Sequence, residues 1–400
     1  MRNGSAGAQG QNTCLFEYDY YIPCIIDSDK NKIIQNPIIK AEKMKLKSLF
    51  GRGQEKILGL DISSWGIKVV GLSGSVEQPV LEVAACTRLP SGSIVGGHIL
   101  KLDDVAQAIR FLLREQRVAP RKVALALPSS AVIIKKIMAE GDLSTSDLQA
   151  HVEEEARQFI PFPLEELSLD YCIVGVNRQR ADMVDVLIAA ARRNRVQELQ
   201  DLAERAELEA CVVEVQSYAL WMATKRLADR YVPDQPNPVA LLLKVGAART
   251  LMQLAVGDIV VYEREQIVGG DQLTQRIAAH YGISMEKAEI KKVTSAVADG
   301  FARSLLEPYI SACVQVLERG MQFIRDSTAV SKIDHIFLSG GGALVPGLPD
   351  ALEKALQARC TLMNPFEAMR LAPQIRNQPA LQQAPLFVGA CGLALRGLVQ

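Results

Sequence analysis

The hydrophobic pattern of the chain marks three glycine-bearing turns that lie far apart in the sequence. Segments 58–73 (LGLDISSWGIKVVGLS) and 240–261 (ALLLKVGAARTLMQLAVGDIVV) each place two apolar runs around a short turn of small residues, which predicts strand, turn and strand. Segment 336–348 (IFLSGGGALVPGL) places an apolar run before three glycines, which predicts strand, turn and helix.

Strand and helix patterns alternate over the rest of the chain, which is typical of an α/β fold. In segment 102–116 the apolar residues recur on one helical face. Another helix is expected to begin after Ser144, with Asp147 close to a capping-box arrangement, and to stop at Pro161. Further strands are expected at 79–89, at 121–137 as a pair around a turn, and at 168–174, 182–191 and 210–215. Further helices are expected at 192–208, 271–282, 285–328, 349–360 and 384–399.

These elements predict two lobes and an inserted α/β subdomain, with the proline-rich segment 231–240 as the bridge into the second lobe. Residues 1–43 are polar and precede a plausible start at Met44, so we expect a disordered extension or a wrongly assigned start. We assign residues 44–120, 211–235 and 385–400 to the first core subdomain, 121–210 to the insertion, 236–284 and 330–384 to the second core subdomain, and 285–329 to a small helical subdomain of the second lobe.

Composition and residue spacing argue against several classes of protein. The 45 basic and 45 acidic residues cancel, so bulk charge gives no reason to expect a nucleic-acid partner. The most apolar long segment, 239–261, is interrupted by charged residues, and we expect no transmembrane segment. The eight cysteines contain no CxxC pair and the four histidines have no ligand spacing, which disfavours zinc and histidine-based triads.

The first turn carries groups suited to phosphate. Ser63, Ser64 and Trp65 form the turn, where backbone N–H groups converge on an anion and hydroxyls add donors. Asp61 is a candidate ligand of a hydrated Mg²⁺ ion, since magnesium keeps several waters and uses few carboxylates. Lys68 is a candidate phosphate contact, although an outward-facing strand lysine and a plain surface hairpin remain alternatives.

The second turn offers a similar set of small residues. Gly246, Ala247 and Ala248 form the turn itself. Gly269 and Gly270 precede a predicted helix, and a helix N-terminus is a further place that favours an anion. Both turns are therefore candidates for holding the phosphates of one nucleotide.

The remaining candidates concern the ribose and the base. Glu289 and Lys292 lie three residues apart on one predicted helix face, where they suit ribose hydroxyls or, equally, an ordinary surface ion pair. Gly340, Gly341 and Gly342 would let a flat base approach the backbone closely, or would serve a turn that needs positive φ. The P-loop, the Rossmann glycine pattern and GxSxG are absent, so nucleotide binding would have to use the hairpins.

With the three turns in this order, the chain resembles the actin-like ATPase superfamily, and within it the PilM family of type IV pilus assembly. The segments that carry the resemblance are DLSTSDLQAHVEEEARQFIPFPLEELSLDYCIV (142–174), VGGDQLTQRIAAHYGISMEKAEIKK (268–292) and FLSGGGALVPGL (337–348). The ending FVGACGLALRG also fits, and the resemblance extends from about Lys47 to the C-terminus.

The resemblance implies an FtsA-like fold, in which two lobes flank ATP and Mg²⁺ and block 121–210 forms the inserted small subdomain. It also implies a partner, the N-terminal cytoplasmic segment of the inner-membrane protein PilN, bound between the first core subdomain and the insertion. Contacts with other pilus assembly proteins follow from the same resemblance. The expected location is cytoplasmic, peripheral to the inner membrane through this partner.

The chain departs from the family pattern in the second turn, where an aspartate is usual and Lys244 stands instead. That lysine could pair with a phosphate directly and displace the ion. We therefore expect ATP binding with weak or no hydrolysis, and we name no catalytic residue. A small-molecule kinase of the same superfamily and a nucleotide-free structural homologue remain alternatives.

Overall fold

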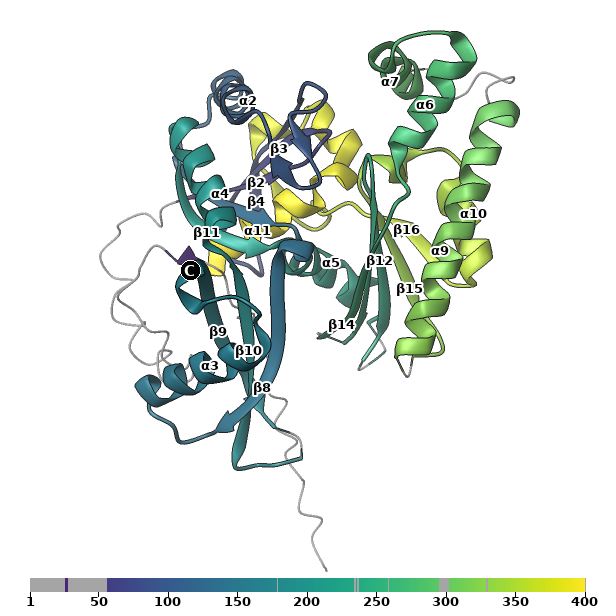
Figure 1. Ribbon diagram of the computed structural model, residues 1–400. Coiled ribbons are helices and arrows are strands. Elements are labelled where there is room, and N and C mark those ends of the chain that lie inside the picture. The colour runs from purple at the N-terminus through teal and green to yellow at the C-terminus, as the bar shows by residue number, and fades with distance from the viewer. Residues whose placement is uncertain are drawn as a thin grey trace, which may run out of the picture.

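The computed structural model describes residues 26–27 and 56–399, except 178, 234, 236, 258, 295–301 and 329. The expectation for residues 1–43 lies outside the described residues, apart from the two-residue strand β1 (Ile26–Asp27). Figure 1 shows two lobes side by side, with a smaller sheet extending below the first lobe.

The first lobe is built on a seven-stranded sheet in the order β1-β11-β7-β2-β3-β4-β17. Strands β2, β3 and β4 are antiparallel neighbours, whereas β7 runs parallel to both β2 and β11. Helices α2 (Leu102–Glu115) and α4 (Arg193–Arg205) cover one face, and α5 (Gln216–Tyr231) and α11 (Val388–Val399) cover the other. The strands are β2 (Ile57–Ile62), β3 (Gly66–Gly74), β4 (Pro79–Arg88), β7 (Lys122–Leu127), β11 (Glu209–Val215) and β17 (Arg370–Leu371).

A separate three-stranded antiparallel sheet has the order β8-β10-β9. Helix α3 (Thr145–Phe159) packs on it through Leu148 and Val152. The Oγ atom of Ser144 accepts a hydrogen bond from the amide of Asp147 at 3.2 Å, so the predicted N-cap is confirmed. The strands are β8 (Val132–Glu140), β9 (Leu167–Val176) and β10 (Met183–Arg192).

This sheet occupies only part of the predicted 121–210 block. Strand β7, at the start of the block, pairs inside the seven-stranded sheet with β11, which begins at the last two residues of the block and continues into the predicted first core subdomain. Helix α4 also packs on that sheet. An apolar alternating run identifies a strand but not the sheet that receives it, so the sequence boundaries were too wide at both ends.

The second lobe has a five-stranded sheet in the order β14-β13-β12-β15-β16. Helices α6 (Gly270–Tyr281) and α9 (Glu307–Ser327) share a buried apolar cluster with it, and α9 follows a π-helical turn, Ala302–Leu306. Helix α7 (Met285–Thr294) lies against α6 at the top of this lobe (Figure 1). The strands are β12 (Val239–Val245), β13 (Thr250–Val256), β14 (Ile259–Gln266), β15 (His335–Ser339) and β16 (Arg359–Leu362).

Three predicted helices have different bounds in the structure. Helix α10 (Leu348–Leu356) ends where Gln357 takes a φ of 53°, and the residues after it form β16 rather than a continuation of the helix. The C-terminal segment is a 3₁₀ stretch over Pro379–Phe387 before α11 begins. The predicted helix 285–328 corresponds to α7 (Met285–Thr294) and to α9 with its preceding π-helical turn, and residues 295–301 lie outside the described part of the chain.

Candidate functional site

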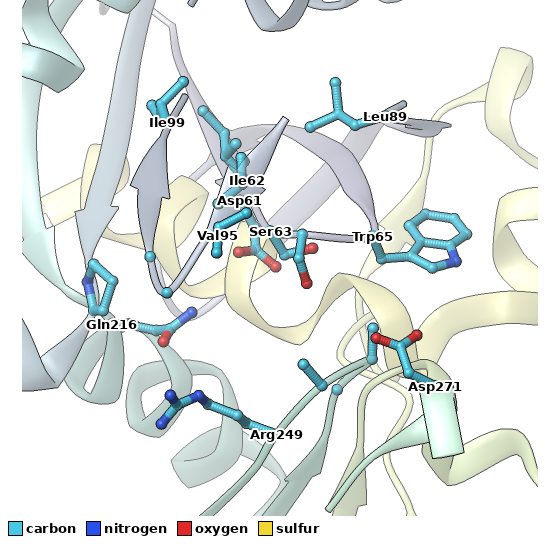
Figure 2. A pocket seen from close by; sticks show the side chains of 18 of the residues that line it. Asp61, Ile62, Ser63, Trp65, Leu89, Val95, Ile99, Gln216, Arg249 and Asp271 are labelled. Atoms are coloured by element: carbon cyan, nitrogen blue, oxygen red, sulfur yellow. The ribbon is translucent and has the colours of Figure 1, made fainter. Parts of the chain in front are cut away.

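A cavity of about 1260 Å³ lies between the two lobes and is lined by residues of both (Figure 2). The first lobe contributes the turn between β2 and β3, Arg88 at the end of β4, and the short strands β5 (Ile94–Val95) and β6 (His98–Ile99). The second lobe contributes the turn between β12 and β13 and the first residues of α6 and α7. Two of the three predicted turns therefore meet in one cavity.

The first turn is a tight reciprocal hairpin. The amide of Ser63 donates to the carbonyl of Gly66 at 3.0 Å, and the amide of Gly66 donates back to the carbonyl of Ser63 at 3.1 Å. Lys68 Nζ donates to Ser63 Oγ at 2.6 Å and so ties the turn to β3. Ser63, Ser64 and Trp65 line the cavity, whereas Lys68 is buried behind the turn.

Asp61 meets two lysines from opposite lobes, and we call Asp61, Lys68 and Lys244 the lysine–aspartate cluster. Asp61 lies opposite Lys68 in the β2–β3 register, and its Oδ2 is 3.8 Å from Lys68 Nζ and 3.7 Å from Lys244 Nζ. Burial opposes ionisation of Asp61, but the two ammonium groups outweigh it and hold the pKa of Asp61 below its ordinary value. Asp61 is therefore a buried carboxylate shared between two cations.

The second turn is held in place by the start of α6. The amide of Gly246 donates to the carbonyl of Arg249 at 2.9 Å. The amide of Gly270 donates to the carbonyl of Gly246 at 3.0 Å, and that of Asp271 donates to the carbonyl of Ala247 at 2.9 Å. The first amides of α6 thus brace the turn instead of facing the cavity.

The glycine pair before α6 allows this close contact. A Cβ on Gly269 would lie 2.3 Å from the carbonyl oxygen of Ala247, so only glycine fits there. Gly246, Ala247 and Ala248 line the cavity, and Gly269 and Gly270 do not. The pair predicted to contact phosphate instead supports the turn.

Glu289 and Lys292 form a close ion pair on α7, with 2.5 Å between Lys292 Nζ and Glu289 Oε2. Thr274 Oγ1 donates to Glu289 Oε2 at 2.6 Å, and Lys292 Nζ lies 2.9 Å from the same hydroxyl. Burial opposes ionisation of Glu289, but these donors hold its pKa below the usual range. Glu289 lines the cavity and Lys292 lies behind it.

The third turn lies beside the second but does not line the cavity. Gly340, with a φ of 84°, donates its amide to the carbonyl of Pro385 at 2.8 Å. A Cβ on Gly340 would lie 2.3 Å from the carbonyl oxygen of Val245, and one on Gly342 would lie 2.3 Å from Val245 Cγ1. Gly340 and Gly342 therefore serve close packing on the end of β12, while a Cβ on Gly341 would meet nothing within 4 Å.

Several cavity residues were not predicted from the sequence. Met285 and Ile290 of α7 supply an apolar wall of the cavity. Arg88 NH2 is 3.6 Å from Glu289 Oε1 and links the lobes across the mouth of the cavity. Gln216 brings an amide to the cavity directly after β11 (Figure 2). Of these residues, only Gln216 could have been identified from the sequence, because residues just beyond the ends of parallel strands commonly face ligands.

The surroundings of Asp61 do not fit a protein-bound Mg²⁺ ion. Magnesium requires oxygen ligands in an octahedral arrangement, whereas Asp61 Oδ2 has two lysine nitrogens within 4 Å. The carboxylate of Asp271 lies on the Trp65 side of the cavity, away from Asp61 (Figure 2). Over the part of the chain that the structure describes, no group of three or more His, Cys, Asp or Glu residues is arranged to hold a metal.

Two α/β lobes whose hairpin turns face each other across a shared cleft define the class of the chain, the actin-like ATPase fold. The chain belongs to the family of the type IV pilus assembly protein PilM, whose family model matches residues 59–398. The predicted fold class and the family resemblance are both confirmed, although the FtsA-type character of the insertion stays a prediction.

Many solved structures are similar to this chain, and two of them bear on its family and fold. A PilM–PilN type IV pilus biogenesis complex contains a chain with 29% identity and a TM-score of 0.73, and the match covers 86% of this chain and 99% of that one. The ethanolamine utilization protein EutJ from Carboxydothermus hydrogenoformans has 13% identity and a TM-score of 0.52, with 90% and 99% covered, and supports the fold alone. Among the described helices, none is long and apolar enough to span a membrane.

Proposed function

We propose that this protein is an actin-like adaptor that holds ATP between its lobes and binds the N-terminal cytoplasmic segment of a PilN-like protein at the inner membrane. Membership of the PilM family and the similarity to a PilM–PilN complex support the partner. In this proposal the adaptor is cytoplasmic and peripheral to the membrane, and nucleotide state is coupled to pilus assembly.

The observation that supports nucleotide binding most directly is the set of backbone amides at the two turns. Ser64, Trp65, Ala247 and Ala248 line the cavity, and none of their amides donates a hydrogen bond within the described part of the chain. Amides of this kind on two facing turns form nests for phosphate oxygens. Two such nests, one in each lobe, suit a polyphosphate that bridges them.

The rest of the cavity suits a nucleoside. The proposed place for the base is the apolar wall of Met285 and Ile290, and Glu289 lies on the same helix face for ribose hydroxyls. A cavity of about 1260 Å³ is larger than the usual range for small-molecule sites, roughly 300–1,000 Å³, so a nucleotide would leave room beside it.

Coupling between nucleotide and partner would run through the lobes. Among the described residues, two ion pairs cross the cleft, Lys244 with Asp61 and Arg88 with Glu289. A nucleotide in the cavity would contact residues of both pairs and would therefore alter the lobe arrangement, as in hinge closure. The partner groove is proposed between the first sheet and the three-stranded sheet, both on the first lobe side of this hinge.

The experiment is a calorimetric titration of a PilN-type N-terminal peptide into the full chain, with and without ATP. We expect binding in both cases and a difference in affinity of about fivefold or more when ATP is present, which is the usual lower range of allosteric coupling. Absence of peptide binding by folded, ATP-loaded protein would contradict the adaptor. Equal affinity with and without ATP would contradict the coupling, and an unchanged melting temperature at millimolar ATP would favour a nucleotide-free homologue.

A further inference from the structure

The lysine–aspartate cluster places two lysine side chains against one carboxylate at the floor of the cavity, and burial lowers the pKa of Lys68. It contains one carboxylate and two ammonium groups, with separations of 3.7 and 3.8 Å. A divalent cation placed beside Asp61 would be repelled by both lysines at short range. A phosphate oxygen placed there would be attracted by them.

Lys244 is the lysine that a ligand can reach. Its side chain is 17% exposed and lines the cavity, whereas that of Lys68 is 7% exposed. Lys68 is also committed to the first turn through Ser63 Oγ at 2.6 Å and the carbonyl of Gly66 at 3.3 Å. Lys244 extends from β12, two residues before the second turn begins at Gly246.

Lys244 also stands where both lobes converge. It leaves the second lobe at the end of β12 and contacts Asp61 of the first lobe, beside the turn at Ser63. A lysine ammonium is a compact point charge with three donors on a flexible stem, and it suits phosphate oxygens without fixed geometry. One ammonium at this place can therefore serve phosphate held between the two turns.

We infer that Lys244 acts as a built-in cation for the phosphates, so that this protein binds nucleoside polyphosphates without a divalent metal. This inference rests on the proposed function, because it requires a nucleotide in the cavity. Asp61 then orients Lys244 instead of holding a hydrated ion, and Lys244 exchanges part of its contact with Asp61 for a phosphate oxygen.

The test measures the affinity of the full chain for ATP by calorimetry, first with EDTA and then with excess Mg²⁺. We expect the two dissociation constants to agree within about threefold for the natural sequence. For Lys244→Asp we expect affinity in EDTA to fall at least about tenfold and to recover with Mg²⁺, because Asp61 gains a second carboxylate beside it. Lys354→Asp, which makes the same charge change on the exposed side of α10, should behave like the natural sequence.

The outcomes separate the inference from the proposed function. ATP binding that requires Mg²⁺ in the natural sequence would overturn the inference and leave the nucleotide site standing. No ATP binding in either buffer would overturn both. Should Lys244→Asp fail to fold, Lys244→Gln replaces it, and there we expect the loss of affinity without rescue by metal; unchanged affinity in EDTA would contradict the role of Lys244.

Discussion

At the scale of single residues, one buried ion pair lies outside the lining of the cavity. Glu214 on β11 and Arg396 on α11 are each 1% exposed, and Arg396 Nε donates to Glu214 Oε2 at 3.2 Å. Burial raises the pKa of Glu214 to about 7, although Arg396 opposes this. The pair joins a strand of the first sheet to the C-terminal helix.

Replacing Arg396 with Met should therefore destabilise the fold by about 3 kcal/mol or more, because it leaves a buried carboxylate without its partner. The loss should be larger at pH 8 than at pH 5. A carboxyl whose pKa is raised on folding contributes stability below its unfolded pKa, and that contribution disappears as the pH rises. Urea unfolding at both pH values checks this.

Two further variants complete this measurement. Arg325→Met, on the exposed side of α9, should leave stability unchanged within about 0.5 kcal/mol. Glu214→Gln combined with Arg396→Met should recover part of the loss and remove its pH dependence. An Arg396→Met protein as stable as the natural one at pH 8 would show that the pair contributes nothing.

At the scale of elements, most strands and helices could be predicted from the spacing of hydrophobic residues. The elements with which each one pairs or packs could not. The hairpin at 58–73 is confirmed, and it places Asp61 opposite Lys68 as its register requires. The sheet membership of β7 and β11 depends on which distant strand pairs with each, which no local pattern encodes.

The candidate site shows the same limit. Turns made of small residues predict where backbone can approach a ligand or another chain segment, but not which of these occurs. Gly246 lines the cavity, whereas Gly340 packs against Val245. The contact between Arg88 and Glu289 joins two lobes and could not be found from sequence spacing.

Helix α11 packs on α5 at a distance that only glycine permits. A Cβ on Gly392 would lie 1.7 Å from the carbonyl oxygen of Ala219, which belongs to the backbone of α5. Gly392→Ala should therefore lower the free energy of unfolding by about 3 kcal/mol or more, despite the gain in helix propensity.

Gly320→Ala on α9 is the matched control for this substitution. Its Cβ would meet Met252 Sδ at 2.4 Å, which is the end of a flexible side chain and can move aside. We expect it to cost clearly less than Gly392→Ala in chemical denaturation. Equal costs for the two substitutions would contradict the close helix contact.

At the scale of the whole molecule, ion pairs link the lobes around the cavity, and these pairs differ in how deeply they are buried. Lys244 and Asp61 meet at the buried floor, whereas Arg88, which is 41% exposed, meets Glu289 at the mouth. An exposed ion pair contributes about 1 kcal/mol or less to stability. The effect of the pair between Arg88 and Glu289 should therefore appear in the motion of the lobes and not in the melting temperature.

Arg88→Ala should leave the melting temperature nearly unchanged but speed hydrogen exchange in α7, which loses the ion pair of Glu289 with the first lobe. Mass spectrometry of exchange in the full chain provides the measurement. Arg114→Ala, which removes an exposed pair with Glu207 inside the first lobe, is the control and should not affect α7. Identical exchange of α7 in the two variants would show that Arg88 does not hold the lobes.

We infer that two turns from different lobes jointly hold the phosphates of one nucleotide. The decisive measurement is a crystal structure of the full chain with a non-hydrolysable ATP analogue. We expect phosphate oxygens within hydrogen-bond distance of the amides at Ser64–Trp65 and at Ala247–Ala248, with Lys244 Nζ beside them. A nucleotide bound elsewhere, or held by one lobe alone, would contradict it.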